Sequence, residues 1–153
     1  MAELRREAYT MGLYVAVCLL AAGAAAPTDH PPHVIGLIWG VTIGLALAHW
    51  FAFRVSTRFV AGGVVDRSDI EMAAAQLAGA AGVAVLATIP VLLFPTSLEF
   101  RAVGFLLAAF VGLIAYVAKR KGGASPTSAL GYALVVLVAA ATVVEVKNLL
   151  AGH

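Results

Sequence analysis

Charged residues and cysteine are scarce in this sequence. Asp, Glu, Lys and Arg make up 12% of its 153 residues, whereas soluble domains carry roughly 25%. Cys18 is the only cysteine, which excludes a disulfide within the chain and a cysteine-based metal motif. Hydrophobic residues instead account for 62% of the chain, and the mean hydropathy is +0.98. This composition is typical of an integral membrane protein.

Several functional motifs are missing as well. The chain has neither the T-V-G-Y-G filter of potassium channels nor the arginine ladder of a voltage sensor. It contains no P-loop, no G-x-S-x-G, no H-E-x-x-H and no pair of catalytic carboxylates. No two spans carry a histidine pair suited to haem. We therefore expect no enzymatic activity, no cofactor and no binding of nucleic acid.

Long apolar runs separated by short polar turns predict five transmembrane helices. A helix needs about 20 apolar residues to cross the hydrocarbon core. Residues 68–71 and 96–99 have capping-box spacing and predict helix starts, and Ser125 before Pro126 predicts another. The longest connection is expected at 55–67. The predicted all-α bundle forms a single transmembrane domain over 1–153, with spans at about 9–26, 33–54, 69–94, 97–118 and 127–150.

The first span has an alternative interpretation as a signal peptide. Arg5 and Arg6 would form its charged region, 11–20 its apolar region, and the sequence AAGAAA its cleavage site. Pro27 would then follow the cut, where it fits poorly. We therefore expect the first helix to be retained.

Basic residues are distributed unevenly between the two sides of this arrangement. Eight fall on the side of the N-terminus, whereas Arg101 and Lys147 fall on the other. Cytoplasmic loops are enriched in Lys and Arg, so the pattern predicts a cytoplasmic N-terminus and a C-terminus outside. The Ala/Gly/Val/Arg bias resembles a bacterium with a GC-rich genome, and we expect a bacterial plasma membrane. The eight residues are Arg5, Arg6, Arg54, Arg58, Arg67, Lys119, Arg120 and Lys121.

Small residues recur at every fourth position of the second and fourth spans. Residues at this spacing share one helix face, and in lipid a small-residue face lets another backbone approach closely. We expect these faces to pack, either within the subunit or between subunits. They comprise Gly36, Gly40, Gly44 and Ala48 in the second span, and Gly104, Ala108 and Gly112 in the fourth.

His49, Gln76 and Asp69 are the polar candidates within the membrane. His49 lies five residues before Arg54, and Gln76 lies six residues after Ile70, so both lie at similar depth on successive antiparallel helices. Asp69 precedes Gln76 by seven residues and shares its face. The three could form a hydrogen-bonded set, and an ionisable group within a span is a functional hypothesis by default. Alternatively, water or a neighbouring helix satisfies the histidine near the interface.

Polar residues also gather on the predicted outer side. Asp29, His30 and His33 lie in a proline-rich turn, with Glu99 and Glu145 near the same side. Histidine and carboxylate ligands can hold a divalent metal. A solvated turn with a helix-capping role explains the pattern better, and we predict no metal site. Glu145 is expected to be a structural carboxylate at the interface.

Two functions from different classes fit this sequence. The first is a homo-oligomeric ion or proton pathway, because one subunit is too small to enclose much of a pore and the small-residue faces could assemble several copies. The second is a non-catalytic membrane subunit or scaffold that packs against a partner protein. The shared depth of His49 and Gln76 favours the first. The expected partners are the lipid bilayer and either further copies or another membrane protein.

Overall fold

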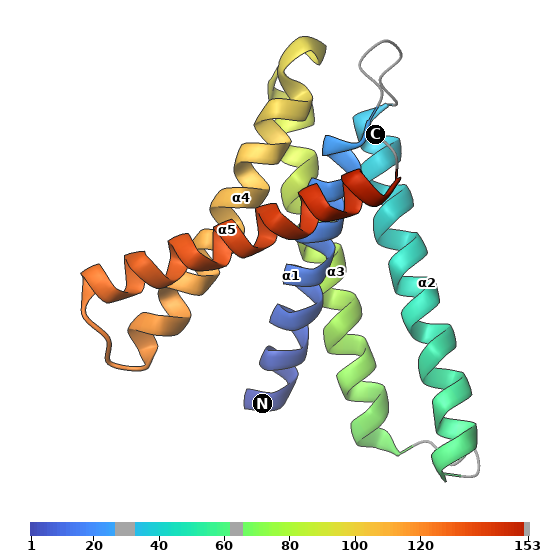
Figure 1. Ribbon diagram of the computed structural model, residues 1–153. Helices are drawn as coiled ribbons and strands as arrows, with labels where there is room; N and C mark the ends of the chain where they lie inside the picture. The colour runs from blue at the N-terminus through green and yellow to red at the C-terminus, as the bar shows by residue number, and fades with distance from the viewer. Residues whose placement is uncertain (27–32, 62–65, 152–153) are drawn as a thin grey trace.

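The computed structural model describes residues 1–26, 33–61 and 66–151. These residues form five helices, each long and apolar enough to cross a membrane (Figure 1). The predicted class, an all-helical protein with five candidate membrane spans, is therefore confirmed. The helices are α1 (Ala2–Ala24), α2 (Val34–Ala61), α3 (Arg67–Leu93), α4 (Thr96–Lys121) and α5 (Pro126–Ala151).

All five helices extend past their predicted spans at one end or both, and α1 at its start and α2 at its end extend furthest. α1 begins at Ala2, and α2 continues through 55–61, a stretch that the sequence analysis assigned to a connection. No glycine or proline interrupts this stretch. The hydroxyls of Ser56 and Thr57 donate to the backbone carbonyl of Phe53, at 3.0 and 2.8 Å. These bonds satisfy the two hydroxyls within the helix itself. The helical conformation of α2 therefore continues beyond its apolar part.

The start of α3 differs from the predicted capping box at Ser68 and Glu71. Two aspartates form the box instead, since the backbone N–H of Asp66 donates to Oδ2 of Asp69 at 3.2 Å. Glu71 pairs with Arg67 one turn away, with 3.0 Å between Nε and Oε1. The prediction of a helix start here was correct, but its capping residues were wrong.

The starts of α4 and α5 provide a second comparison. α4 begins at Thr96 with Pro95 in the capping position and no capping bond from a side chain, so the box predicted there does not form. At α5 the Oγ of Ser125 accepts a hydrogen bond from the N–H of Ser128 at 3.3 Å. Pro126 occupies the first helical position, where its missing N–H has no cost. That prediction is confirmed.

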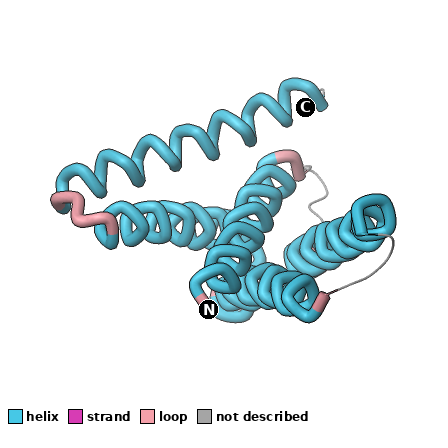
Figure 2. Tube along the Cα trace, turned by 90° about the horizontal axis from the view of Figure 1, so that it is seen from below, coloured by secondary structure: helices cyan, strands magenta, loops and turns pink. Residues whose placement is uncertain are grey.

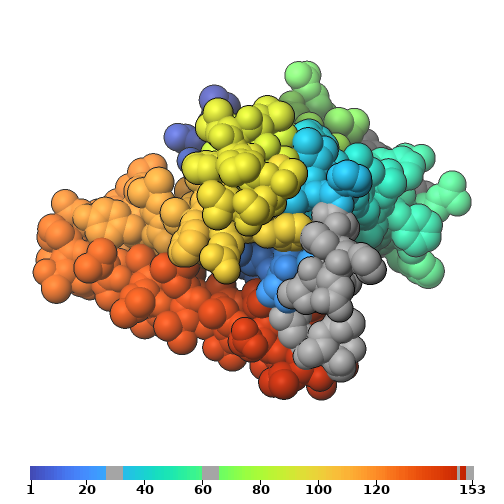
Figure 3. Space-filling model, turned by 90° about the horizontal axis from the view of Figure 1, so that it is seen from above, coloured from blue at the N-terminus to red at the C-terminus, as the bar shows by residue number. Residues whose placement is uncertain are grey.

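The helices alternate in direction, so α1 and α3 run parallel to each other (Figure 1). α1 contacts α3 more extensively than it contacts any other helix, and the most extensive contact of α4 is with α5. Two residues, Phe94 and Pro95, separate α3 from α4, and the two helices are antiparallel neighbours as predicted. α5 crosses the outside of the bundle at a slant (Figure 2). Seen from above, the end of α4 and the start of α5 project to one side (Figure 3).

The core between α1, α2, α3 and α4 is apolar. Its largest fully buried side chains are Ile38, Leu107, Val15 and Val111. Among the described residues, Thr42 is the buried polar one, and its hydroxyl donates to the carbonyl of Ile38 in its own helix at 2.7 Å. The described core therefore contains no chain of polar side chains that leads from one end of the subunit to the other.

Glycine permits the close contact between α1 and α3. A Cβ built at Gly79 would collide with the backbone of Ala8, since it would lie 2.8 Å from the carbonyl carbon. A Cβ at Gly12 would lie 3.3 Å from Cγ2 of Val83. Close approach of backbones at small residues is the usual mode of helix packing in lipid. This contact positions the polar residues at the N-terminal end of the bundle.

Candidate functional site

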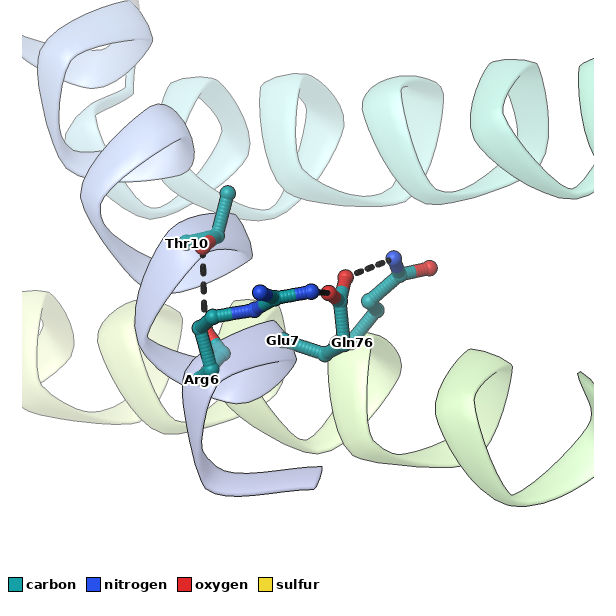
Figure 4. A network of polar contacts seen from close by, with 4 residues as sticks. All are labelled: Arg6, Glu7, Thr10 and Gln76. Carbon is teal, nitrogen blue, oxygen red and sulfur yellow. Dashed lines mark hydrogen bonds and ion pairs between the residues drawn. The ribbon is translucent and has the colours of Figure 1, made fainter. Parts of the chain in front are cut away.

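The candidate polar site lies where the first turns of α1 meet α3. Nε2 of Gln76 donates a hydrogen bond to Oε2 of Glu7 at 2.7 Å. Arg6 approaches the other oxygen of the same carboxylate, with 3.4 Å between its Nη2 and Oε1 of Glu7. Figure 4 shows the carboxylate between these two donors. Thr10 donates its hydroxyl to the carbonyl of Arg6 at 2.9 Å, so it does not take part directly.

The close helix contact explains why Glu7 and Gln76 meet. Gln76 lies three residues before Gly79, and Glu7 is next to Ala8. Residues three apart lie on the same side of a helix. Because the backbones touch at Gly79 and Ala8, Glu7 beside the contact and Gln76 one turn before it are brought within hydrogen-bonding distance.

The three predicted polar residues are placed differently from one another. His49 is exposed on α2. Asp69 is half-buried and caps α3 by accepting a hydrogen bond from Asp66. Among the described residues, no hydrogen bond joins His49, Gln76 and Asp69 to one another. The structure instead brings Gln76 of α3 to Glu7 of α1.

Glu7 is the residue that the sequence analysis missed. It stands in a charged segment with Glu3, Arg5 and Arg6, which the sequence analysis placed before the first span. Its relation to Gln76 depends on a contact between residues 69 positions apart. The spacing of the small residues Ala8 and Gly12, four apart and directly after Glu7, is the signal that could have indicated a packing face here.

The small-residue face of α2 has no partner in the described subunit. Gly36, Gly40, Gly44 and Ala48 are all exposed. A Cβ built at Gly40 or Gly44 meets nothing within 4 Å, and one at Gly36 meets only its own helix start at 3.9 Å. α2 packs on the core through its opposite side instead, which contains Val34, Ile38 and Thr42.

The small-residue face of α4 is partly used. A Cβ at Gly112 would lie 3.2 Å from Cδ1 of Leu137 in α5, while one at Gly104 meets nothing within 4 Å. Ala108 is half-buried. Gly112 therefore lies at the contact between α4 and α5, where Lys119 also approaches the ring of Tyr132, with 5.6 Å from Nζ to the ring centroid.

The polar residues predicted on the outer side form no metal-binding group among those that the structure describes. Asp29 and His30 lie outside the described residues. His33 is exposed before α2, and Glu145 is exposed on α5. Glu99 lies in the first turn of α4. Within residues 1–26, 33–61 and 66–151, no group of three or more His, Cys, Asp or Glu residues could hold a metal ion.

Comparison with known proteins adds no relative. The chain matches no protein-family model, no curated protein sequence and no solved structure. Functional inference therefore depends on the residues and their geometry. Three features of the described residues bear on function: the contact of Glu7 with Gln76 and Arg6, here called the Glu7 site, the apolar core and the uncovered face of α2.

Proposed function

We propose that this multi-pass membrane protein forms an ion or proton pathway as a homo-oligomer. The observation that supports it is the hydrogen bond from Gln76 of α3 to the carboxylate of Glu7 in α1. Ionisable side chains in membrane bundles commonly mark ion pathways and proton relays. A carboxylate held by an amide donor can take part in such a relay without moving far.

Under this proposal the route lies between copies and not through one subunit. The described core offers buried apolar side chains between the helices, which give no stable position to an ion. His49 is exposed on α2 and can therefore reach space outside the subunit. The small-residue face of α2 is also uncovered, so copies could approach one another through this helix.

The second candidate is a non-catalytic membrane subunit or scaffold. The uncovered face of α2 also supports it, because a helix of a different protein could pack there as well as a second copy. The bond from Gln76 to Glu7 would then fix α1 against α3 and have no part in transport. A catalytic role has no support in the groups near the site, and we propose none.

We further propose the orientation and location of the protein. The starts of α1 and α3 and the end of α2 lie together at one end of the bundle (Figure 1). Arg5, Arg6, Arg54, Arg58 and Arg67 lie in these segments. Because basic residues are retained on the cytoplasmic side, we place the N-terminus in the cytoplasm and the protein in a bacterial-type plasma membrane, with the C-terminus outside.

Flux through reconstituted protein distinguishes the two candidate functions. Liposomes that contain the purified protein should leak protons or small cations when a gradient is applied. Glu7→Gln removes the titratable group but keeps an amide of the same size, so it should remove most of this flux. His49→Phe should lower it. Glu3→Gln is the matched control, because Glu3 is exposed in the same helix, and it should leave flux unchanged.

The opposite results would decide against the pathway. Wild-type protein that is well reconstituted, oligomeric and without flux would exclude it and leave the scaffold. Flux that is unchanged in both Glu7→Gln and His49→Phe would mean that the Glu7 site takes no part. The oligomeric state of each variant, measured by light scattering in detergent, separates a lost pathway from lost assembly.

A further inference from the structure

A groove opens between the start of α1 and the end of α4, away from the contact of Glu7 with Gln76. It has a volume of about 520 Å³. Leu13, Ile114 and Val117 contribute apolar lining, which we call the floor of the groove. α1 and α4 contact each other, and seen from below the start of α1 and the end of α4 diverge (Figure 2). The groove therefore lies at the end of the bundle where α1 begins.

Cationic side chains line the rim of this groove. They are Arg5 and Arg6 from α1 and Lys121 from α4. Arg6 forms an ion pair with Glu7, with 3.4 Å between Nη2 and Oε1. Arg5 and Lys121 are exposed, and neither forms an ion pair with another described residue. Two cations without acidic partners thus stand at one end of an apolar groove in a protein whose surroundings are lipid.

We propose that this groove binds one anionic phospholipid, with its phosphate at Arg5 and Lys121 and an acyl chain along the floor. Guanidinium and ammonium groups recognise phosphate oxygens through charge-assisted hydrogen bonds. The apolar floor provides the contact that an acyl chain needs and that a soluble anion could not use. Basic pockets between transmembrane helices are known to take acidic head groups. The proposal is independent of any transport function.

Native mass spectrometry of the detergent-purified protein tests this proposal with dioleoyl phosphatidylglycerol and dioleoyl phosphatidylcholine as probes. Wild-type protein should retain one phosphatidylglycerol in preference to phosphatidylcholine. The double variant Arg5→Gln/Lys121→Gln should bind phosphatidylglycerol about tenfold more weakly or worse, because two charge-assisted contacts are lost. The matched control Arg54→Gln/Arg58→Gln also removes two positive charges, on α2 outside the groove, and should bind as the wild type does.

Two further measurements test the acyl chain and the phosphate separately. Ala118→Trp fills the groove from an exposed position and keeps every charge, so it should also lose the lipid. Free glycerol 3-phosphate at millimolar concentration should not displace the lipid, because it cannot use the floor. If Arg5→Gln/Lys121→Gln does not fold, Lys121→Gln alone replaces it, and thermal unfolding checks every variant.

Three results would overturn the proposal. Equal loss of lipid in both double variants would mean a general attraction to the basic end of the protein. Displacement by glycerol 3-phosphate would mean a phosphate site without a lipid chain. Retention of phosphatidylglycerol in Ala118→Trp would place the lipid elsewhere on the surface.

Discussion

Gly79 has no room for a side chain, because the backbone of α1 occupies the place where one would be. Ala8 contributes the nearest atoms to a Cβ built there, including its Cα at 3.0 Å. Gly82, three residues later in the same helix, meets nothing within 4 Å. The two glycines have the same helical context and differ in what lies opposite them, which makes them a matched pair.

Gly79→Ala should therefore destabilise the protein by about 1–3 kcal/mol, since α1 must shift away from α3. The measurement is thermal unfolding in detergent. Gly82→Ala should be neutral or slightly stabilising, because alanine is the better helix former. Equal stability of Gly79→Ala and the wild type would show that α1 and α3 do not touch at this residue.

The polar site was only partly predictable at the residue scale. The sequence identified Gln76, because a polar side chain in a run of small residues is conspicuous. It could not identify Glu7 as the partner, because that pairing depends on the backbone contact between Gly79 and Ala8. Asp69 was chosen for the face it shares with Gln76, yet its position in the first turn of α3 lets it cap the helix instead.

At the scale of the helix, α2 illustrates what periodicity can and cannot establish. Two stripes at spacing four lie on it, one containing Val34, Ile38 and Thr42 and the other Gly36, Gly40, Gly44 and Ala48. The first is buried and the second is exposed. In the middle of α2, the residues on both sides of the helix are apolar enough for a membrane interior. Hydropathy therefore does not distinguish the side that faces the core. Which side of α2 packs on the core depends on the shape of the surfaces of α1 and α3.

Gly40→Leu should leave the stability of the single subunit unchanged and weaken assembly. The reason is that a side chain at Gly40 meets nothing in the described subunit, whereas a helix packed on that face would be forced away. Oligomeric state by light scattering and thermal unfolding in detergent together measure the two effects.

Gly131→Leu is the control for this experiment, since Gly131 is an equally uncovered glycine on α5, and it should leave assembly unchanged. If Gly40→Leu assembles like the wild type, the uncovered face of α2 contacts lipid only.

On the scale of the whole molecule, all five helices were predicted, because runs of apolar residues and turn-forming residues mark them directly. The arrangement was less accessible. Tight turns predicted that α3 and α4 are neighbours, but the packing of α1 on α3 and the slanted course of α5 across the outside depend on contacts distant in sequence. The charge pattern predicted an orientation, which remains to be measured.

Cysteine labelling tests the proposed orientation. In a Cys18→Ala background, a cysteine at Ser68 or Gly122 should react with a membrane-impermeant maleimide only from the cytoplasmic side, and one at Ser97 only from outside. Gly122 is preferred to its neighbour Gly123, because φ at Gly123 is +81°, a conformation that disfavours a side chain. Labelling with the sides reversed would contradict a cytoplasmic N-terminus.

The packing of α1 against α3 also bears on how the chain is made. Synthesis runs from the N-terminus, and about 70 residues separate the end of α1 from the end of α3. At about 5–20 residues per second, roughly 3–14 s pass between the synthesis of α1 and the completion of α3, the helix that α1 contacts most. During this interval Gly12 and its neighbours face lipid or the insertion machinery. A nascent chain arrested after α2 would therefore present a first helix that lacks its main packing partner, and membrane quality control would have a surface to recognise.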